Sequence, residues 1–274
     1  MPKLIEDARH RPSALSHDGE GASPRSTEPS RARCRARAKT LLTILAALVL
    51  APLTVVVGMG IPGNGYYLSG TLIVLYAIVP FFVAFEGRRP TAREIAVVAV
   101  LTALAVAARA AFVWVPHFKP MAAIIMIAGI AAGPQTGFLV GSVAALASNF
   151  IFGQGPWTPW QMLAFGLVGL VAGLLADARV FPRANLSWPR RVALAVTGFV
   201  LIVGLAGPIL DTSTFFYLST APTPELAATV YLAGLPVNAI HGAATALTLL
   251  VVANPLLDQL DRVRVKYGLL NRSR

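Results

Sequence analysis

The most unusual polar chemistry of this chain lies in a short turn between two long apolar runs. Residues 149–161 read N-F-I-F-G-Q-G-P-W-T-P-W-Q. Indole rings offer stacking surfaces and neighbouring amides offer hydrogen bonds, a combination that suits a planar or amphipathic organic ligand. The candidate ligand contacts in this turn are Asn149, Gln154, Trp157, Trp160 and Gln161. Trp is also enriched at membrane surfaces, so either indole taken alone has a purely interfacial explanation.

A second group of polar residues falls in the last third of the chain. Asn238 and His241 are three residues apart, so they share one face of a helix within an apolar run. Polar residues in such runs tend to face the bundle interior, where they contact a ligand or bond to another helix. Asp211 follows Gly207-Pro208 and is predicted either to end a helix or to contact a ligand. A lone His without nearby Cys, Asp or Glu predicts no metal site.

Arg109 is the only formally charged residue well inside one of these apolar runs. A long Arg side chain near a helix end reaches the membrane surface, which is one explanation of its position. A charge within the membrane is otherwise a functional candidate, so we predict a structural or gating role for Arg109. The same run places Ala103, Ala107 and Ala111 four residues apart. Such small residues let a second helix approach closely, inside the bundle or from another protein.

These residues are set in a chain with the composition of a membrane protein. Of its 274 residues, 56% are hydrophobic and only 13% are charged. The apolar runs do not alternate with polar residues, which excludes a β-barrel and predicts an all-α polytopic membrane protein. The net charge of +11 does not indicate nucleic-acid binding, because the basic residues form clusters that flank the apolar runs.

Eight spans are predicted, and the charges of the loops between them support this number. The candidate spans are 41–59, 67–85, 95–115, 120–134, 137–152, 161–176, 192–210 and 229–252. Alternate loops are basic, whereas the loops of the other side contain one Lys and no Arg. The positive-inside rule therefore predicts a plasma-membrane protein with both termini in the cytoplasm. The outer side then carries most of the unusual chemistry, including the 149–161 turn.

The regions outside the spans have a different composition. Residues 1–39 are rich in Arg, Ser and Pro and have too few large apolar residues to fold, so we expect a disordered cytoplasmic tail. A basic tail at 256–274 is expected at the other end. No phosphate-binding loop, H-E-x-x-H or G-x-S-x-G motif is present in the sequence, and no internal two-fold repeat is evident. The sequence thus predicts neither an enzyme nor a resident cofactor.

Taken together, these motifs resemble the substrate-binding S component of an energy-coupling factor (ECF) transporter. The resemblance covers about 103–253 and includes F-K-P at 118–120 and A-G-I-A-A-G-P-Q-T-G-F at 128–138. Its most specific part is S-N-F-I-F-G-Q-G-P-W-T-P-W-Q-M at 148–162. It implies a six-helix binding core, here 91–255, preceded by a two-helix extension at 40–90.

The resemblance also implies a function and partners. An S component captures a vitamin or related micronutrient at its outer face, docks on a transmembrane T component with two ATPases, and topples in the membrane to release its substrate. Ala103, Ala107 and Ala111 match the family's docking surface for the T component. Cobalamin is the leading candidate substrate, with riboflavin, other vitamins and queuosine-type precursors open. The alternatives are a self-sufficient transporter or channel with a proton path through Arg109, Asp211 and His241, and a membrane enzyme acting on a lipid-linked substrate with His241 as base.

Overall fold

Helices account for the whole architecture that the structure describes. The computed structural model describes scattered positions between 49 and 76 and then residues 92–218 and 223–267. The chain divides into two units, Met1–Ala38 and Lys39–Arg274, and the described residues all belong to the second. The predicted spans 41–59 and 67–85 lie largely outside the described residues and stay predictions. Within them, the hydroxyl oxygens of Thr54 and Tyr76 are 3.2 Å apart.

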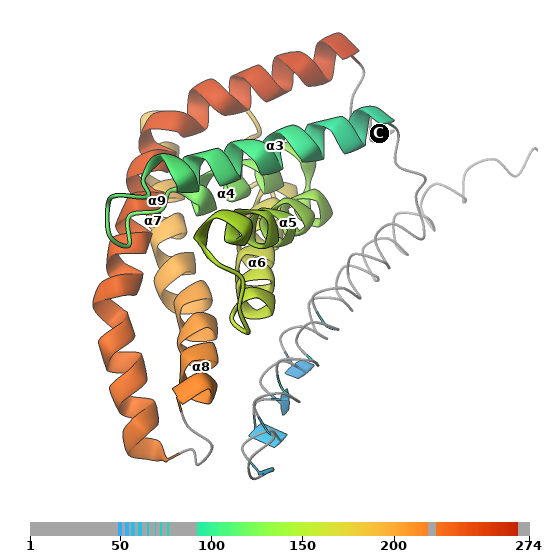
Figure 1. Ribbon diagram of the computed structural model, residues 1–274. Helices are drawn as coiled ribbons and strands as arrows, with labels where there is room; N and C mark the ends of the chain where they lie inside the picture. The colour runs from blue at the N-terminus through green and yellow to red at the C-terminus, as the bar shows by residue number, and fades with distance from the viewer. Residues whose placement is uncertain are drawn as a thin grey trace, which may run out of the picture. The chain divides into compact units, whose positions relative to one another are not determined.

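The six remaining predicted spans correspond to described helices (Figure 1). In chain order they are α3 (Ala92–Ala111), α4 (Met121–Ala132), α5 (Pro134–Phe152), α6 (Thr158–Asp177), α7 (Trp188–Leu201) continuing through η1 (Ile202–Ala206) into α8 (Gly207–Leu218), and α9 (Pro224–Tyr267). Five segments in the described part of the chain are long and apolar enough to cross a membrane. The sixth, α4, has 12 residues. That length gives about 18 Å, which is shorter than the hydrocarbon core.

The short helix α4 forms the centre of the bundle. Its residues from Met121 to Ile130 are buried, and it carries no charged residue. Gly133 separates it from α5 and has φ 98°, a left-handed backbone that favours glycine. Pro134 then opens α5, where its missing N–H costs no hydrogen bond. The predicted boundary between the spans 120–134 and 137–152 is therefore wrong, because α4 ends at Ala132, α5 begins at Pro134 and Gly133 alone separates them.

Close backbone contact holds α4, α5 and α6 together. A Cβ at Gly169 would overlap the carbonyl oxygen of Gly137, and a Cβ at Gly173 would overlap the backbone of Pro134. Gly129 in turn packs against the backbone of Gly169. The glycines of α6 thus serve packing inside the bundle, since each helix presents bare backbone to the next.

The seventh span continues further than the sequence indicated. Its predicted end at 210 is wrong, because α8 continues to Leu218 and Asp211 lies inside it. Thr212 and Thr214 donate hydrogen bonds to the carbonyls of Pro208 and Leu210, at 2.7 and 3.2 Å, so these hydroxyls are satisfied within the helix. Between α7 and α8, residues Ile202–Ala206 form a π-helix, a widened turn that often marks functional sites.

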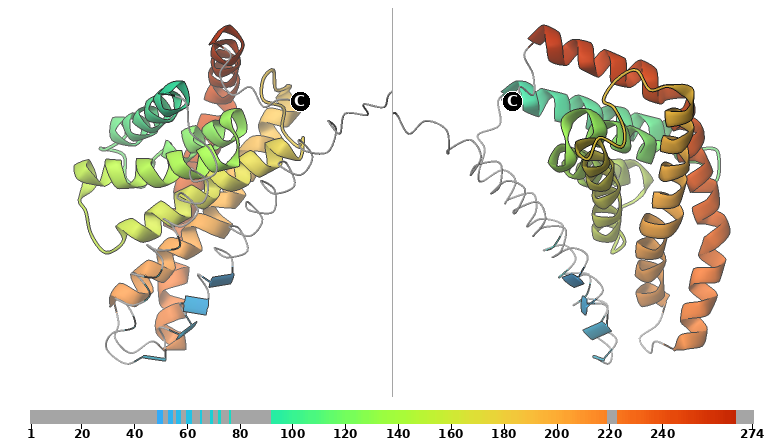
Figure 2. Two further views of the ribbon diagram at one scale, coloured as in Figure 1. Left: turned by 90° about the vertical axis from the view of Figure 1, so that its right-hand side faces the viewer. Right: turned by 180° about the vertical axis from the view of Figure 1, so that it is seen from behind.

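The last helix, α9, spans 44 residues and contains Pro236 and Pro255. It bends strongly toward its C-terminal end, which is visible in Figure 1 and in the right-hand view of Figure 2. Proline accounts for such bends because it removes a helical hydrogen bond. Near the bend, the Asn254 amide donates to the Leu186 carbonyl at 2.9 Å and accepts from the Leu186 N–H at 3.0 Å. The connection between α6 and α7 is thereby attached to α9.

Candidate functional site at one end of the bundle

Arg109 joins the end of α3 to the end of α5. It lies in the last turn of α3, and its Nη1 donates to the Ser148 hydroxyl and, at 2.9 Å, to the Asn149 side-chain oxygen. The guanidinium also lies over the Phe152 ring, 4.5 Å from its centroid. The charge predicted inside a span is thus partly buried against α5. It is held by two polar partners and one aromatic face, an arrangement that stabilises a partly desolvated cation.

Asn149 is the central residue of this polar group. It is 1% exposed, and its side-chain nitrogen donates to Thr158 Oγ1 at 2.9 Å and to Gln161 Oε1 at 2.8 Å. Both hydrogens of the amide are therefore used, and its oxygen accepts from Arg109. Asn149 connects three helices, and its described contacts are all within the protein.

The turn between α5 and α6 is organised by Thr158. Its hydroxyl donates to Gln154 Oε1 at 2.9 Å and accepts from the Gly155 N–H at 3.3 Å as well as from Asn149. Gln154 also donates to the Leu146 carbonyl at 3.0 Å. Gly153 begins the turn with φ 102°, a backbone suited to glycine. Thr158 was not among the predicted site residues, because its role in the turn depends on contacts that its sequence neighbours do not indicate.

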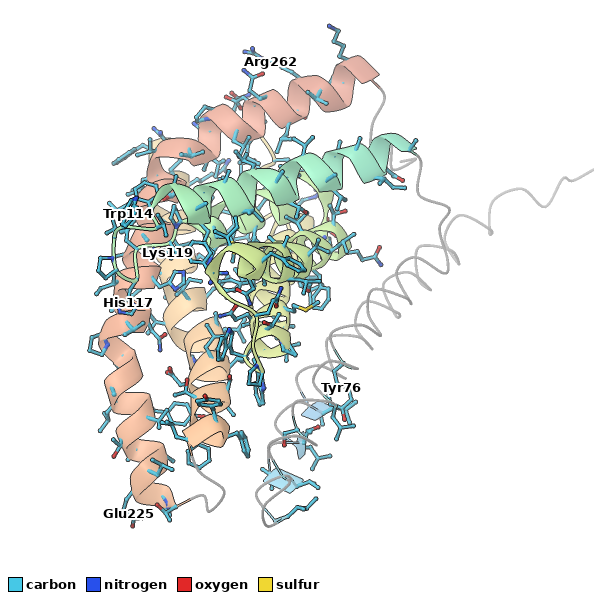
Figure 3. The ribbon with its side chains drawn as sticks, in the orientation of Figure 1. Tyr76, Trp114, His117, Lys119, Glu225 and Arg262 are labelled. Carbon is cyan, nitrogen blue, oxygen red and sulfur yellow. The ribbon has the colours of Figure 1, made fainter. Side chains whose placement is uncertain are left out.

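The segment between α3 and α4 covers the same end of the bundle. Figure 3 labels Trp114, His117 and Lys119 in this segment, beside α9. The Lys119 ammonium donates to carbonyls of the chain just after α3, those of Phe112, Val113 (3.3 Å) and Val115 (3.0 Å). It also lies 5.7 Å from the centroid of the Phe152 ring. Desolvation, and then the charge of Arg109, lower the pKa of Lys119.

A separate polar pair links α8 to α9. Asn238 donates to Asp211 Oδ2 at 2.8 Å. A Cβ at Gly234 would overlap the Asp211 carboxylate, and a Cβ at Gly207 would come within 2.5 Å of the Asn238 side chain. Two glycines therefore make room for the pair between the helices. The structure brings together two residues that were predicted as separate candidates. The π-helical segment lies about one turn from Asp211.

Helix α6 packs against both α5 and α8, and it contributes aromatic residues to the α8 side. Trp160 is 2% exposed and stacks on Phe216 of α8 with centroids 6.1 Å apart. Trp157 meets Tyr217 edge-on at 6.3 Å. The Trp160 indole N–H is buried and has no hydrogen-bond partner within the described protein. A buried donor of this kind is a candidate contact for a bound molecule.

His241 approaches the same region from α9. Its ring lies 6.0 Å from the ring of Phe165 on α6, and its Nε2 is a second buried atom with no partner among the described residues. His241 therefore brings a polar ring of α9 against α6. Unsatisfied buried polar atoms are uncommon in proteins, which makes His241 a further candidate contact.

Several of the predicted site residues thus gather around the N-terminal half of α6. Asn149, Gln154 and Gln161 lie on its α5 side, whereas Trp160 and His241 lie toward α8 and α9. Ser148, Phe152 and Thr158 belong to the same region and were missed, because single hydroxyls and one Phe carry no distinctive signal in sequence. The described residues contain no cluster of His, Cys, Asp and Glu that could hold a metal ion.

The small residues of α3 face away from these contacts. Ala103, Ala107 and Ala111 are all exposed, whereas Leu101 and Ala105 of the same helix are buried in the core. Of the two explanations for this row, internal packing and contact with another protein, exposure favours the second.

The fold and the site define a multi-pass α-helical membrane protein whose polar and aromatic chemistry is concentrated at one end. Residues 90–262, more than half of the chain, match the family described as ECF-type riboflavin transporter, S component. The chain therefore belongs to this family of transporter S components, and the predicted resemblance is confirmed. The family is a transport component rather than an enzyme, which excludes the enzymatic alternative.

Two curated relatives are similar to parts of the chain. A UPF0397 protein of Vibrio atlanticus (strain LGP32) is 31% identical over 104 residues, covering 37% of this chain and 53% of that protein. A UPF0397 protein of Clostridium perfringens (strain SM101 / Type A) is 25% identical over 155 residues, covering 55% and 76%. The chain thus spans about half the length of the Vibrio relative. No solved structure matches the chain.

Proposed function

We propose that this chain is the substrate-capture subunit of an ECF-type importer and binds a vitamin at its outer face. The observation that carries the proposal is the convergence of aromatic and amide side chains around the outer half of α6, in a chain of this family. Trp160 and His241 supply buried polar atoms that have no partner in the described part of the chain, and Trp157 supplies a partly exposed ring. We assign Asn149 to holding the turn, and Gln154, Gln161, Asp211 and Asn238 to the walls around the ligand.

Riboflavin is the first substrate to test, because the family description names it. Stacked aromatic rings and amides suit a flavin, which is planar and has hydrogen-bonding edges. Cobalamin, the leading candidate from the turn sequence, is the second. Its larger and less planar body would need a wider opening between the 112–120 segment and the 153–157 turn.

The orientation and assembly follow from the same proposal. We place residues 112–120 and 153–157 outside the cell and the basic connection 178–187 in the cytoplasm. The exposed row Ala103, Ala107 and Ala111 then docks on a T component, which works with two ATPases. The core is assigned to 91–255, preceded by a two-helix extension at 40–90 and flanked by basic cytoplasmic tails at 1–39 and 256–274.

The test is ligand binding by the purified chain in mild detergent. Riboflavin fluorescence should be quenched on stoichiometric binding, and cobalamin would instead give a red preparation with a corrinoid spectrum. Uptake into proteoliposomes should then require the T component and the ATPases. A chain that binds no member of a vitamin panel contradicts the capture role, and uptake without partners indicates a self-sufficient transporter.

A further inference from the structure

Arg109 links two parts of the protein that are distant in sequence. Its backbone belongs to α3, but its guanidinium contacts Ser148, Asn149 and Phe152 at the end of α5. Residues 109 and 149 are 40 positions apart, so only the tertiary structure brings them together. An arginine in this position restricts how α3 rotates and slides against α5, because both movements would separate a charged donor from its acceptors.

The contacts continue without a gap from Arg109 to the outer turn. Asn149 is hydrogen-bonded to both Arg109 and Thr158. Thr158 is in turn hydrogen-bonded to Gln154 and to the backbone N–H of Gly155. The donor–acceptor distances of these hydrogen bonds are between 2.8 and 3.3 Å. The hydrogen bond from Arg109 to Ser148 is shorter. A chain of satisfied hydrogen bonds in a partly buried setting is cooperative, since loss of one member leaves its neighbours without partners.

The other face of α3 is the exposed one. Arg109 is two residues from both Ala107 and Ala111, and two residues correspond to about 200° around a helix. Consistent with this, Ala107 and Ala111 are exposed while Arg109 points into the bundle. Helix α3 thus has an exposed face that carries Ala107 and Ala111, and an opposite face from which Arg109 contacts the residues that hold the outer turn.

We propose that Arg109 is a positioning residue that couples the placement of α3 to the order of the outer turn 153–157. A displacement of α3 weakens the contacts of Asn149 and Thr158 and loosens the turn, and a loosened turn releases α3. One consequence of this inference rests on the proposed function: a partner bound to α3 would change how firmly the ligand-facing turn is held. The coupling itself is a property of the isolated chain.

Hydrogen–deuterium exchange of the full chain in detergent, without vitamin or partner, tests the coupling. Arg109→Met should raise exchange of the backbone amides between 155 and 161 by about tenfold, the effect of losing one or two net hydrogen bonds. Thr158→Val, a substitution in the turn, should in return raise exchange in the last turn of α3. The double variant should exchange no faster than the more affected single variant, because both changes break one network.

Two further variants distinguish coupling from general destabilisation. Thr102→Val alters α3 at a buried hydroxyl that has no partner among the described residues, so it should leave 155–161 unchanged. Arg109→Lys keeps the charge and should restore part of the protection if Arg109→Met folds poorly. The proposal is overturned if Arg109→Met affects α3 alone, or if the two single effects add. Failure of the capture role would appear instead as an absence of vitamin binding by the unaltered chain.

Discussion

Asp211 and Asn238 form a hydrogen-bonded pair across the interface of α8 and α9, with 2.8 Å between the amide nitrogen and a carboxylate oxygen. Gly207 and Gly234 leave the space in which the two side chains meet. The pair adjoins the π-helical segment Ile202–Ala206, where α7 becomes α8. Two polar groups therefore support the bundle on either side of α6, this pair and the group around Asn149.

Removing the donor of the Asp211 pair should destabilise the protein. Asn238→Leu leaves a partly buried carboxylate without its amide partner, and we expect the free energy of unfolding to fall by about 1–3 kcal/mol. Asp211→Asn, which allows an amide–amide hydrogen bond, should cost less. Thermal unfolding in detergent measures both. Equal losses in the two variants would show that the hydrogen bond itself contributes little.

Bare backbone contact between α5 and α6 predicts a strong effect of one added methyl group. Gly169→Ala places a Cβ against the carbonyl of Gly137, and we expect a loss of about 1–3 kcal/mol in unfolding free energy. Gly204→Ala is the matched control, because a Cβ there meets no atom within 4 Å. The free energy of unfolding of the control should equal that of the unaltered chain or be slightly higher. A tolerated Gly169→Ala would contradict the tight packing of the two helices.

Trp160 allows ligand binding to be separated from stability. Trp160→Phe keeps an aromatic ring against Phe216 and removes a buried N–H that has no protein partner in the described chain. The free energy of unfolding should change by less than about 1.5 kcal/mol, as for a conservative core replacement. Riboflavin affinity should fall by about tenfold if the indole donates to it. Trp188→Phe, at the other end of the bundle, should leave affinity unchanged.

The exposed row on α3 predicts a separation of binding from uptake. Ala107→Trp should abolish uptake by the assembled importer and leave vitamin binding by the isolated chain intact, since a bulky side chain prevents close helix approach. Ala107→Ser should retain both activities. Val251→Trp, at a residue of α9 that is 72% exposed, controls for a bulky side chain elsewhere on the surface. Loss of binding in Ala107→Trp would instead assign the row to internal structure.

The sequence by itself determined the class of the protein and the positions of six helices. Long apolar runs must be helical in a membrane, because every backbone N–H and C=O then bonds within its own segment. Glycines such as Gly169 and the 148–162 motif were also readable, since close packing and family resemblance both depend on residue identity at short range. The end of α8 was misread because Asp211, Thr212 and Thr214 look like turn residues, although the threonine hydroxyls bond to carbonyls of the same helix.

Only the tertiary structure decided which of these residues meet. The partners of Arg109, the saturation of the Asn149 amide and the role of Thr158 depend on how each helix is rotated about its axis. The pairing of Asp211 with Asn238 depends on two glycines that bring α8 and α9 together. Side chains 27 or 40 residues apart are joined by packing of whole helices, and no local pattern in the chain carries that information.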